Sequence, residues 1–260
     1  MRITVARVPP LPGPEAVPER ARELAEAAAA AGAALLLLPQ RFAAGWARDA
    51  AGLEAAAEPS DGPTASAMRE VAREAGLALA YGYVERCTGR CYDSLLLIDR
   101  EGRCLSNYRR THAQPEDGAL ALGHGQWLSA MPLGRWRLGL LSGHDLAHPE
   151  PARALRLVGC DLLLVAGARV MPAAAEIYLR ARAAENRCHL AFASTAPDLP
   201  PEVLGPDGAP LARVTGASAL VVADLPDRPP ALDPVLLRGR RPRLYHRLVA
   251  VEPGEADGPA

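Results

Sequence analysis

The sequence predicts a layered α/β fold, and three observations support this prediction. Segments of strand character alternate with segments of helical character along most of the 260 residues. The run over 33–38 is apolar at every position, which is typical of a strand that is buried on both faces under covering helices. A tight Glu-Gly turn between the strand-like segments 93–99 and 103–108 indicates one antiparallel hairpin.

The first half of the chain begins with a strand over 2–8, where apolar and polar residues alternate. An alanine-rich stretch over 15–31 has apolar residues three and four positions apart, and this spacing predicts a helix. A second helix is expected to begin at Pro63 and to end before Gly76. The apolar strand 77–84 follows and leads into the hairpin.

The second half repeats this alternation. The predicted strands are 136–141, 161–165, 189–194 and 218–224, the predicted helices are 149–158 and 173–186, and a turn region lies over 205–210. The residues from Pro226 onward are rich in proline and arginine and predict an extended arm. We therefore expect one domain over 1–250 and a disordered tail over 251–260.

Charge and composition exclude several classes of protein. A net charge of -1 leaves no excess of cations for a nucleic acid or an acidic membrane surface. The longest apolar run, over 27–38, has about 12 residues, whereas a bilayer core requires roughly 20. The N-terminal segment has no signal-peptide pattern, and the five cysteines form no disulfide framework. We expect a cytoplasmic protein with reduced thiols and no cofactor.

Arginine is the only strongly basic residue in this sequence. All 29 cationic side chains are arginine, and alanine, glycine and proline are abundant while asparagine, isoleucine and phenylalanine are scarce. This bias is typical of a GC-rich coding sequence. An arginine can therefore stand where codon usage, and not chemistry, has removed a lysine.

Five phrases of the sequence are informative when they are taken together. They are LLLLPQRFAAGW (35–46), NYRRTHA (107–113), GLLSGHDLAHPE (139–150), RARAAENRCHLAFAS (180–194) and RRPRLYHRL (240–248). In this order they resemble the nitrilase (carbon–nitrogen hydrolase) superfamily, in particular its small amidase-like members. The resemblance extends over about 1–248, and it implies a four-layer αββα sandwich that assembles into dimers or larger homo-oligomers.

The resembled family uses a cysteine thiolate as nucleophile, a glutamate as general base, a lysine that stabilises the tetrahedral intermediate, and a second, supporting glutamate. By resemblance, these four positions are in turn Gly143, Gln40, Arg110 and Gly118. Glu116 and Asp117 lie close enough to Gly118 that the register of the last position stays open.

These replacements predict the loss of the family's chemistry. Gly143 has no side chain, so the covalent step has no nucleophile. The amide of Gln40 cannot accept a proton at neutral pH, which alone slows proton transfer by about two to four orders of magnitude. Arg110 keeps the positive charge of a lysine. We expect no functional catalytic residue, and a pseudoenzyme that binds a small molecule or serves as an assembly subunit, with an active paralogue as a further partner.

Two other chemistries remain open around the vacant position. Ser142, His144 and Asp145 have the residue types of a catalytic triad, but they stand too close in sequence to converge. His144, Asp145 and His148 are weak candidates for metal ligands, because Pro149 disfavours helical geometry at His148. The alternative function is therefore a carbon–nitrogen (amide or nitrile) hydrolase that activates water without a cysteine, with or without a metal.

The charges of the predicted site indicate a class of ligand. Arg110 keeps its charge while Gln40 and Gly143 are neutral, and a buried guanidinium requires an anion. The internal candidates for this anion are Asp145, Glu116 and Asp117. If they point away, a small carboxylate can take their place. The predicted binding residues are Gln40, Arg110, His144 and Asp145.

Overall fold

The computed structural model describes residues 1–113, 117–167, 174–195, 198–214, 219–229, 231 and 239–248. The chain divides into two compact units, Met1–Pro230 and Ala231–Ala260. In the second unit the described residues include two short 3₁₀ turns, η3 (Pro242–Leu244) and η4 (His246–Leu248), and neither contains a buried residue. The predicted arm thus contains helical turns, and the predicted tail over 251–260 lies outside the described residues.

Two sheets form the centre of the first unit. Sheet one has the strand order β13-β1-β2-β3-β4-β5, and β6 pairs with the start of β4. Its strands are β1 (Arg2–Ala6), β2 (Leu35–Leu37), β3 (Ala78–Cys87), β4 (Arg90–Ile98), β5 (Cys104–Arg109), β6 (Leu122–Gly123) and β13 (Leu220–Asp224). Sheet two has the order β12-β11-β10-β9-β8-β7. Its strands are β7 (Ala130–Leu133), β8 (Trp136–Ser142), β9 (Leu162–Ala166), β10 (His189–Ala193), β11 (Glu202–Leu204) and β12 (Pro210–Arg213).

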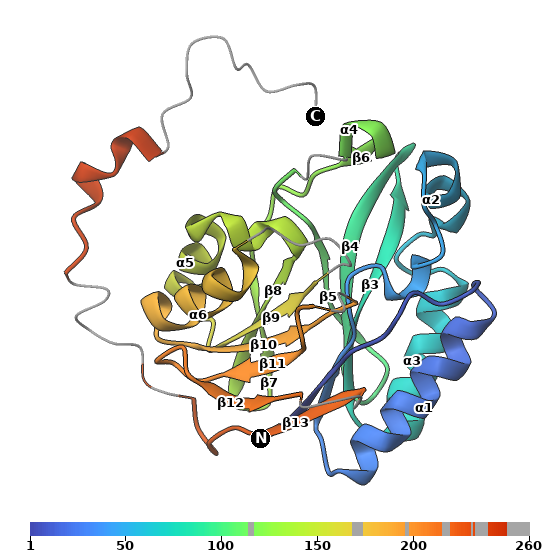
Figure 1. The fold of residues 1–260 in the computed structure, drawn as a ribbon, viewed down its shortest axis with the longest axis horizontal. Coiled ribbons are helices and arrows are strands. Elements are labelled where there is room, and N and C mark those ends of the chain that lie inside the picture. Colours follow the sequence, from blue (N-terminus) through green and yellow to red (C-terminus); the bar gives the residue numbers. More distant parts are fainter. Residues whose placement is uncertain are drawn as a thin grey trace. The chain divides into compact units, whose positions relative to one another are not determined.

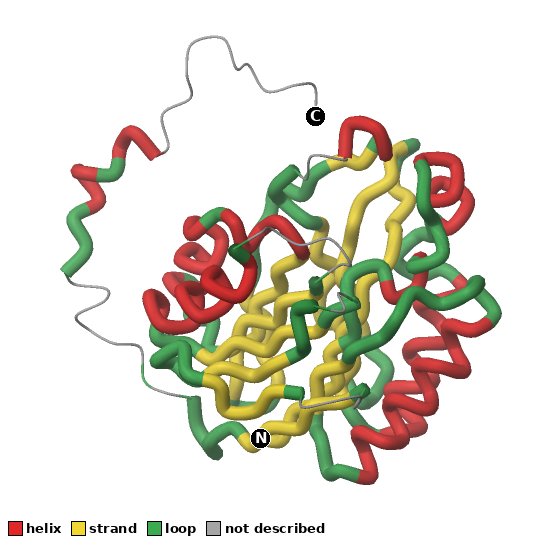
Figure 2. Tube along the Cα trace, viewed as in Figure 1, coloured by secondary structure: helices red, strands yellow, loops and turns green. Residues whose placement is uncertain are grey.

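Helices cover the outer face of each sheet (Figure 1, Figure 2). Helices α1 and α3 pack on sheet one, and α5 and α6 pack on sheet two. The helices are α1 (Ala16–Ala30), α2 (Ala50–Ala56), α3 (Pro63–Ala75), α4 (Asp117–Leu120), α5 (Pro149–Leu157) and α6 (Ala175–Asn186), with the 3₁₀ turns η1 (Phe42–Ala44) and η2 (Gly143–Ala147). The layers are therefore helix, sheet, sheet, helix, which confirms the four-layer αββα sandwich.

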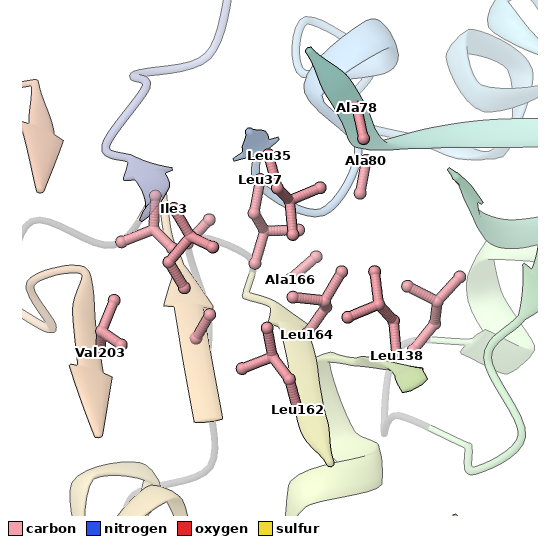
Figure 3. Close-up of a cluster of buried hydrophobic side chains, with 14 of the residues drawn as sticks. Ile3, Leu35, Leu37, Ala78, Ala80, Leu138, Leu162, Leu164, Ala166 and Val203 are labelled. Carbon is pink, nitrogen blue, oxygen red and sulfur yellow. The ribbon is translucent and has the colours of Figure 1, made fainter. Parts of the chain in front are cut away.

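The main hydrophobic core lies between the facing surfaces of the two sheets (Figure 3). Leu35 and Leu37 of sheet one point toward Leu162 and Leu164 of sheet two, whereas Leu36 points outward to the helices. Successive side chains of a strand alternate between its two faces, so a strand that is covered on both sides must be apolar throughout. Each fully buried leucine contributes about 1.5–3 kcal/mol. This packing explains the continuous apolar run over 33–38.

The parallel strands bring distant parts of the sequence to one edge. In sheet two β8, β9 and β10 run parallel, and in sheet one β1, β2 and β3 do. The chain leaves the carboxyl end of β2 at Gln40, that of β8 at Gly143 and that of β9 at Gly167. Ser142 pairs with Ala166, and the backbone N–H of Gln40 donates to the carbonyl of Gly167 at 3.3 Å. Gln40 and Gly143 therefore lie at the same end of the sandwich, where ligands of α/β folds usually bind.

Most predicted elements are confirmed with small shifts at their ends, although Ala173 and Ser218, predicted to begin a helix and a strand, lie outside the described residues. The prediction of a single antiparallel hairpin is wrong, because β3–β4, β7–β8 and β11–β12 also pair antiparallel. The β3–β4 turn is Thr88-Gly89, and both residues have positive φ (47° and 77°), as tight hairpin turns require. The turn lies among charged residues, where the sequence shows no alternation of apolar and polar positions.

The structure also bears on the membrane prediction. Among the residues that the structure describes, no helix combines the length and the apolar character needed to cross a bilayer.

Candidate active site

Gln40 is held at the edge of the sandwich by a close approach to β3. Its side chain is buried, with 2% of its surface exposed. The backbone N–H of Gly82 donates to the carbonyl of Pro39 at 3.1 Å. A Cβ atom on Gly82 would lie only 2.6 Å from the Cα of Gln40. Glycine at position 82 is therefore what allows Gln40 to sit against the strand.

Asp93 of β4 is the centre of a buried polar cluster. Its carboxylate is fully buried on the face of β4 that looks toward sheet two. Its Oδ2 accepts from Nε2 of Gln40 at 2.5 Å and from Nε of Arg41 at 2.8 Å, and it lies 3.8 Å from Nε of Arg110. One carboxylate thus joins two of the residues that the sequence singled out.

Arg110 follows β5 and is fully buried. Its backbone N–H donates to the carbonyl of Asp93 at 2.8 Å, and its Nη2 donates to Oδ1 of Asp117 at 2.7 Å. Its Nη1 donates to the carbonyl of His112. Burial by itself would lower the pKa of Arg110, but the hydrogen bond to Asp117 and the charges of Asp93 and Asp117 raise it above its usual value. The guanidinium is therefore charged and paired inside the protein.

This pairing answers one question that the sequence left open. Of the three neighbouring candidates, Asp117 contacts Arg110, Gly118 has no side chain, and Glu116 lies outside the described residues. Asp117 also accepts from Nε2 of His124 at 3.2 Å. The sequence indicated an external carboxylate ligand only if the internal acids point away from Arg110. Asp117 does not point away, because it pairs with Arg110.

Gly143 forms the sharp turn between β8 and η2. Its φ of 52° lies in the left-handed region, where a residue with a side chain is strained by about 1 kcal/mol or more. A strand that ends in such a turn before a helix presents the turn residue at the top of the sheet, as nucleophile elbows do. Here the elbow is buried and presents no side chain.

Asp145 ties this elbow to the segment that carries Arg110. Its Oδ2 accepts from the hydroxyl of Tyr108 at 2.6 Å and from the backbone N–H of Ser142 at 2.9 Å. Its Oδ1 accepts from Oγ1 of Thr111 and from the backbone N–H of His112, both at 3.0 Å. Burial alone would raise the pKa of Asp145, but hydrogen bonds from the His112 ring, the Tyr108 hydroxyl and the backbone N–H of Ser142 hold it below its usual value. Both oxygens of this ionised carboxylate are engaged.

The histidines of the elbow do not form the arrangements suggested by their spacing. The Nδ1 of His112 lies 3.0 Å from Oδ1 of Asp145, so a histidine from a separate segment joins this aspartate. His148 is extended and stacks on His112 with ring centroids 4.1 Å apart. Burial and the neighbouring His112 lower the pKa of His148. Within the described ranges no group of three or more His, Cys, Asp or Glu side chains is placed to hold a metal ion.

The sequence indicated Gln40, Arg110 and the segment at Gly143, which stay predicted site residues, but it did not indicate Asp93, which contacts the first two. The sequence did contain a signal, because Asp93 directly precedes Ser94 and the apolar run 95–98 in one predicted strand. A carboxylate inside a buried strand is rarely without a partner. The contacts from Asp145 to Tyr108 and His112 were not predictable from spacing, since they join segments more than 30 residues apart.

Comparison with known proteins identifies the family of this chain. The sequence model of the carbon–nitrogen hydrolase family matches residues 2–223. A hydrolase encoded in the pqqF 5′ region of Pseudomonas protegens is 34% identical over 228 residues, which cover 82% of this chain and 80% of that protein. The omega-amidase of Homo sapiens is 28% identical over 226 residues, covering 79% of this chain and 81% of the human protein.

A solved structure gives the same result at the level of the fold. The amidase from Nesterenkonia sp. AN1 superposes with a TM-score of 0.79 at 28% sequence identity, covering 95% of this chain and 99% of that chain. Relatives in sequence and in structure thus agree with the layered fold of this chain. The chain belongs to the carbon–nitrogen hydrolase family, the nitrilase superfamily, and to its amidase-like branch.

Proposed function

We propose that this protein binds a small carboxamide beside Gln40, Asp93 and Arg110, and that it does not hydrolyse the ligand by the cysteine chemistry of its family. The observation that carries the proposal is Gly143, which leaves the elbow without a nucleophile. The five cysteines are free thiols on other elements. They are Cys87 and Cys91 beside the β3–β4 turn, Cys104 at the start of β5, and Cys160 and Cys188 in the core beneath α5 and α6.

The charges of the site favour a neutral ligand over the carboxylate that the sequence indicated. Arg41 and Arg110 contribute two positive charges, and Asp93 and Asp117 contribute two negative charges. The guanidinium of Arg110 already has a carboxylate at 2.7 Å. A carboxylate ligand would add an unbalanced charge to a buried site, and such a charge is costly.

Unpaired polar atoms at the site match the groups of a primary amide. Within the described residues, Oε1 of Gln40 and Oδ1 of Asp93 are buried acceptors without a donor, and Nη2 of Arg41 and Nε of Arg110 are buried donors without an acceptor. Buried polar groups are normally hydrogen-bonded, so these atoms call for a partner. A carboxamide offers two N–H donors and a carbonyl oxygen with two lone pairs, which is the complementary set.

The relatives support binding without turnover. A double mutant of the Nesterenkonia amidase, in which a glutamate is replaced by glutamine and a cysteine by alanine, is described in complex with acrylamide. A single cysteine-to-alanine mutant is described in complex with butyramide. By the resemblance of sequence phrases, this chain has the same glutamine at position 40, and at position 143 it has glycine where the double mutant has alanine.

Calorimetric titration with butyramide and with butyrate tests the binding proposal. We expect saturable binding of butyramide, weaker binding of butyrate, and a loss of about tenfold or more in affinity for Gln40→Leu, because a buried acceptor is removed. Equal binding of both compounds, or butyramide affinity that survives Gln40→Leu, would contradict the proposed site.

Restoring the family's residues tests the loss of catalysis. The wild type should release no ammonia from butyramide, and Gln40→Glu with Arg110→Lys and Gly143→Cys should release it. The matched control carries Gly143→Ala in place of Gly143→Cys, because it bears the same strain at φ 52° without a thiol. Ammonia release by purified wild type that is lost in Gln40→Leu would overturn the pseudoenzyme proposal.

One observation favours a second candidate, direct hydrolysis of an amide by water. The Asp145 carboxylate lies 3.0 Å from Nδ1 of His112, as in sites where an aspartate orients a histidine that acts as general base. In this reaction His112 takes a proton from water and the hydroxide adds to the amide carbonyl. His112 then returns the proton to the amide nitrogen, and the C–N bond breaks to give ammonia and the carboxylic acid. Turnover that His112→Asn abolishes, and that a chelator leaves unchanged, would identify this route.

Assembly is a further part of the proposal. Ile177 of α6 is 69% exposed, on the outer helix layer where α6 neighbours α5. We expect identical chains, or this chain and an active paralogue, to pair through this face. Light scattering should show a homo-oligomer that Ile177→Asp dissociates, and a monomeric wild type would argue against it. The free thiols support a reducing compartment such as the cytoplasm.

A further inference from the structure

A cleft lies at the end of the sandwich opposite to the elbow at Gly143. Its volume is about 860 Å³, within the range of small-molecule sites. It is lined by the starts of β1, β2 and β3, by the β4–β5 turn and by the β7–β8 turn. These are the amino ends of the parallel strands, so the cleft is separate from the elbow at Gly143, which lies at their carboxyl ends.

The floor of the cleft is the uncovered edge of the main core. Met1, Leu105 and Leu133 line the cleft and pack against the core between the sheets, but they remain only partly buried. Trp136 also lines it and is almost fully buried, and its indole N–H has no acceptor among the described residues. The floor therefore offers apolar surface together with one buried donor that lacks a partner.

The rim of the cleft carries one arginine side chain that forms no ion pair with a described residue. Arg103 pairs with Asp99 at 2.7 Å, and Arg100 pairs with Glu101 at 2.8 Å. The exposed Arg135, in the β7–β8 turn, has no ion pair with any described residue. Asp227 is the remaining charged side chain of the lining, and the α-ammonium of Met1 donates to the carbonyl of Leu225 at 2.9 Å.

From this arrangement we propose that the cleft binds an amphipathic monoanion, a compound with an apolar body and a single carboxylate or sulfonate. The apolar body lies on Leu105, Leu133 and Trp136, and the anionic group pairs with the guanidinium of Arg135. Burial of the body removes apolar surface from water, and a charge-assisted contact to a guanidinium is stronger than one between neutral groups. The proposal does not depend on the function of the Gln40 site.

Two fluorescent probes with the same aromatic body test this chemistry. Anilinonaphthalene sulfonate carries an anionic group, and phenylnaphthylamine lacks it. We expect the sulfonate to bind the folded protein at one site, and the uncharged probe to bind about tenfold more weakly, because it cannot pair with Arg135. Octanoate should displace the sulfonate, and octanol should displace it less well.

Variants place the probe in the cleft. Arg135→Ala, on an exposed turn, should weaken sulfonate binding by about tenfold. Asp227→Asn should strengthen it, because a like charge at the rim is removed. Arg20→Ala on α1 is the control, since it also removes an exposed guanidinium but lies away from the cleft, and it should change nothing. Sulfonate binding that Arg135→Ala leaves unchanged, equal binding of the two probes, or binding lost in Gln40→Leu would overturn the proposal.

Discussion

Acid should destabilise this protein over a pH range set by one buried histidine, His189. The ring lies at the start of β10 and is 4% exposed. It packs edge-on against Trp136 with centroids 5.2 Å apart, and its Nδ1 is buried without a hydrogen-bond partner among the described residues. Burial, with a further contribution from the charge of Arg156, lowers the pKa of His189 from 6.5 to about 4.

The sign and size of the effect follow from linkage. Below pH 6.5 the unfolded chain binds a proton at His189 that the folded chain rejects, so stability is lost as the pH falls toward about 4. From these two pKa values, the contribution of His189 to the free energy of unfolding should decrease by about 2 kcal/mol between pH 7 and pH 5, and by roughly 3 kcal/mol once the pH is below 4. Asp145, whose pKa is lowered, adds a loss only at lower pH, as its carboxylate becomes protonated.

Urea denaturation at a series of pH values measures this loss. The variant His189→Gln cannot titrate, so its free energy of unfolding should decrease between pH 7 and pH 5 by about 2 kcal/mol less than that of the wild type. His246→Gln, in the second compact unit, removes an exposed histidine and should leave the wild-type profile unchanged. Parallel profiles for His189→Gln and wild type would refute the reasoning, because His189 would then have an ordinary pKa in the folded protein.

Three further predictions follow from buried contacts. Gly82→Ala should lower the free energy of unfolding by about 1–3 kcal/mol in thermal unfolding, and it should also weaken ligand binding. The new Cβ would lie 2.6 Å from the Cα of Gln40 and force the loop off β3. Unchanged affinity would count against the positioning of Gln40 by Gly82. Tyr108→Phe should lower the free energy of unfolding in urea by about 2 kcal/mol, since it removes only the hydroxyl that donates to Asp145 at 2.6 Å. A change near zero would mean that water replaces this donor. Glu202→Gln should stabilise the protein by about 1 kcal/mol at pH 8 but not at pH 4. Burial raises the pKa of this carboxylate, so its ionised form is disfavoured in the folded protein. Equal effects at both pH values would show that charge is not the cause.

The fold was largely predictable because its main signals are local. The apolar run over 33–38 and the alternation of strand and helix patterns reflect covering layers on both sides of each sheet. The additional hairpins were not predictable in the same way. The β3–β4 turn depends on positive φ at Thr88 and Gly89 within a charged segment, and β7, β11 and β12 are too short to establish a periodic pattern.

For the candidate site too, the sequence gives the identity of each residue and the tertiary structure gives its contacts. The sequence by itself determined that positions 40 and 143 carry neither a carboxylate nor a thiol, because glutamine and glycine lack these groups in any conformation. Only the tertiary structure decided how the remaining charges are balanced. Asp117 and Asp93 reach Arg110, and His112 reaches Asp145, through contacts between elements that are separate in the sequence. The physical reason is that a residue type sets the chemistry available at a position, whereas the partner of a buried charge depends on which side chains the packed strands bring within hydrogen-bond distance.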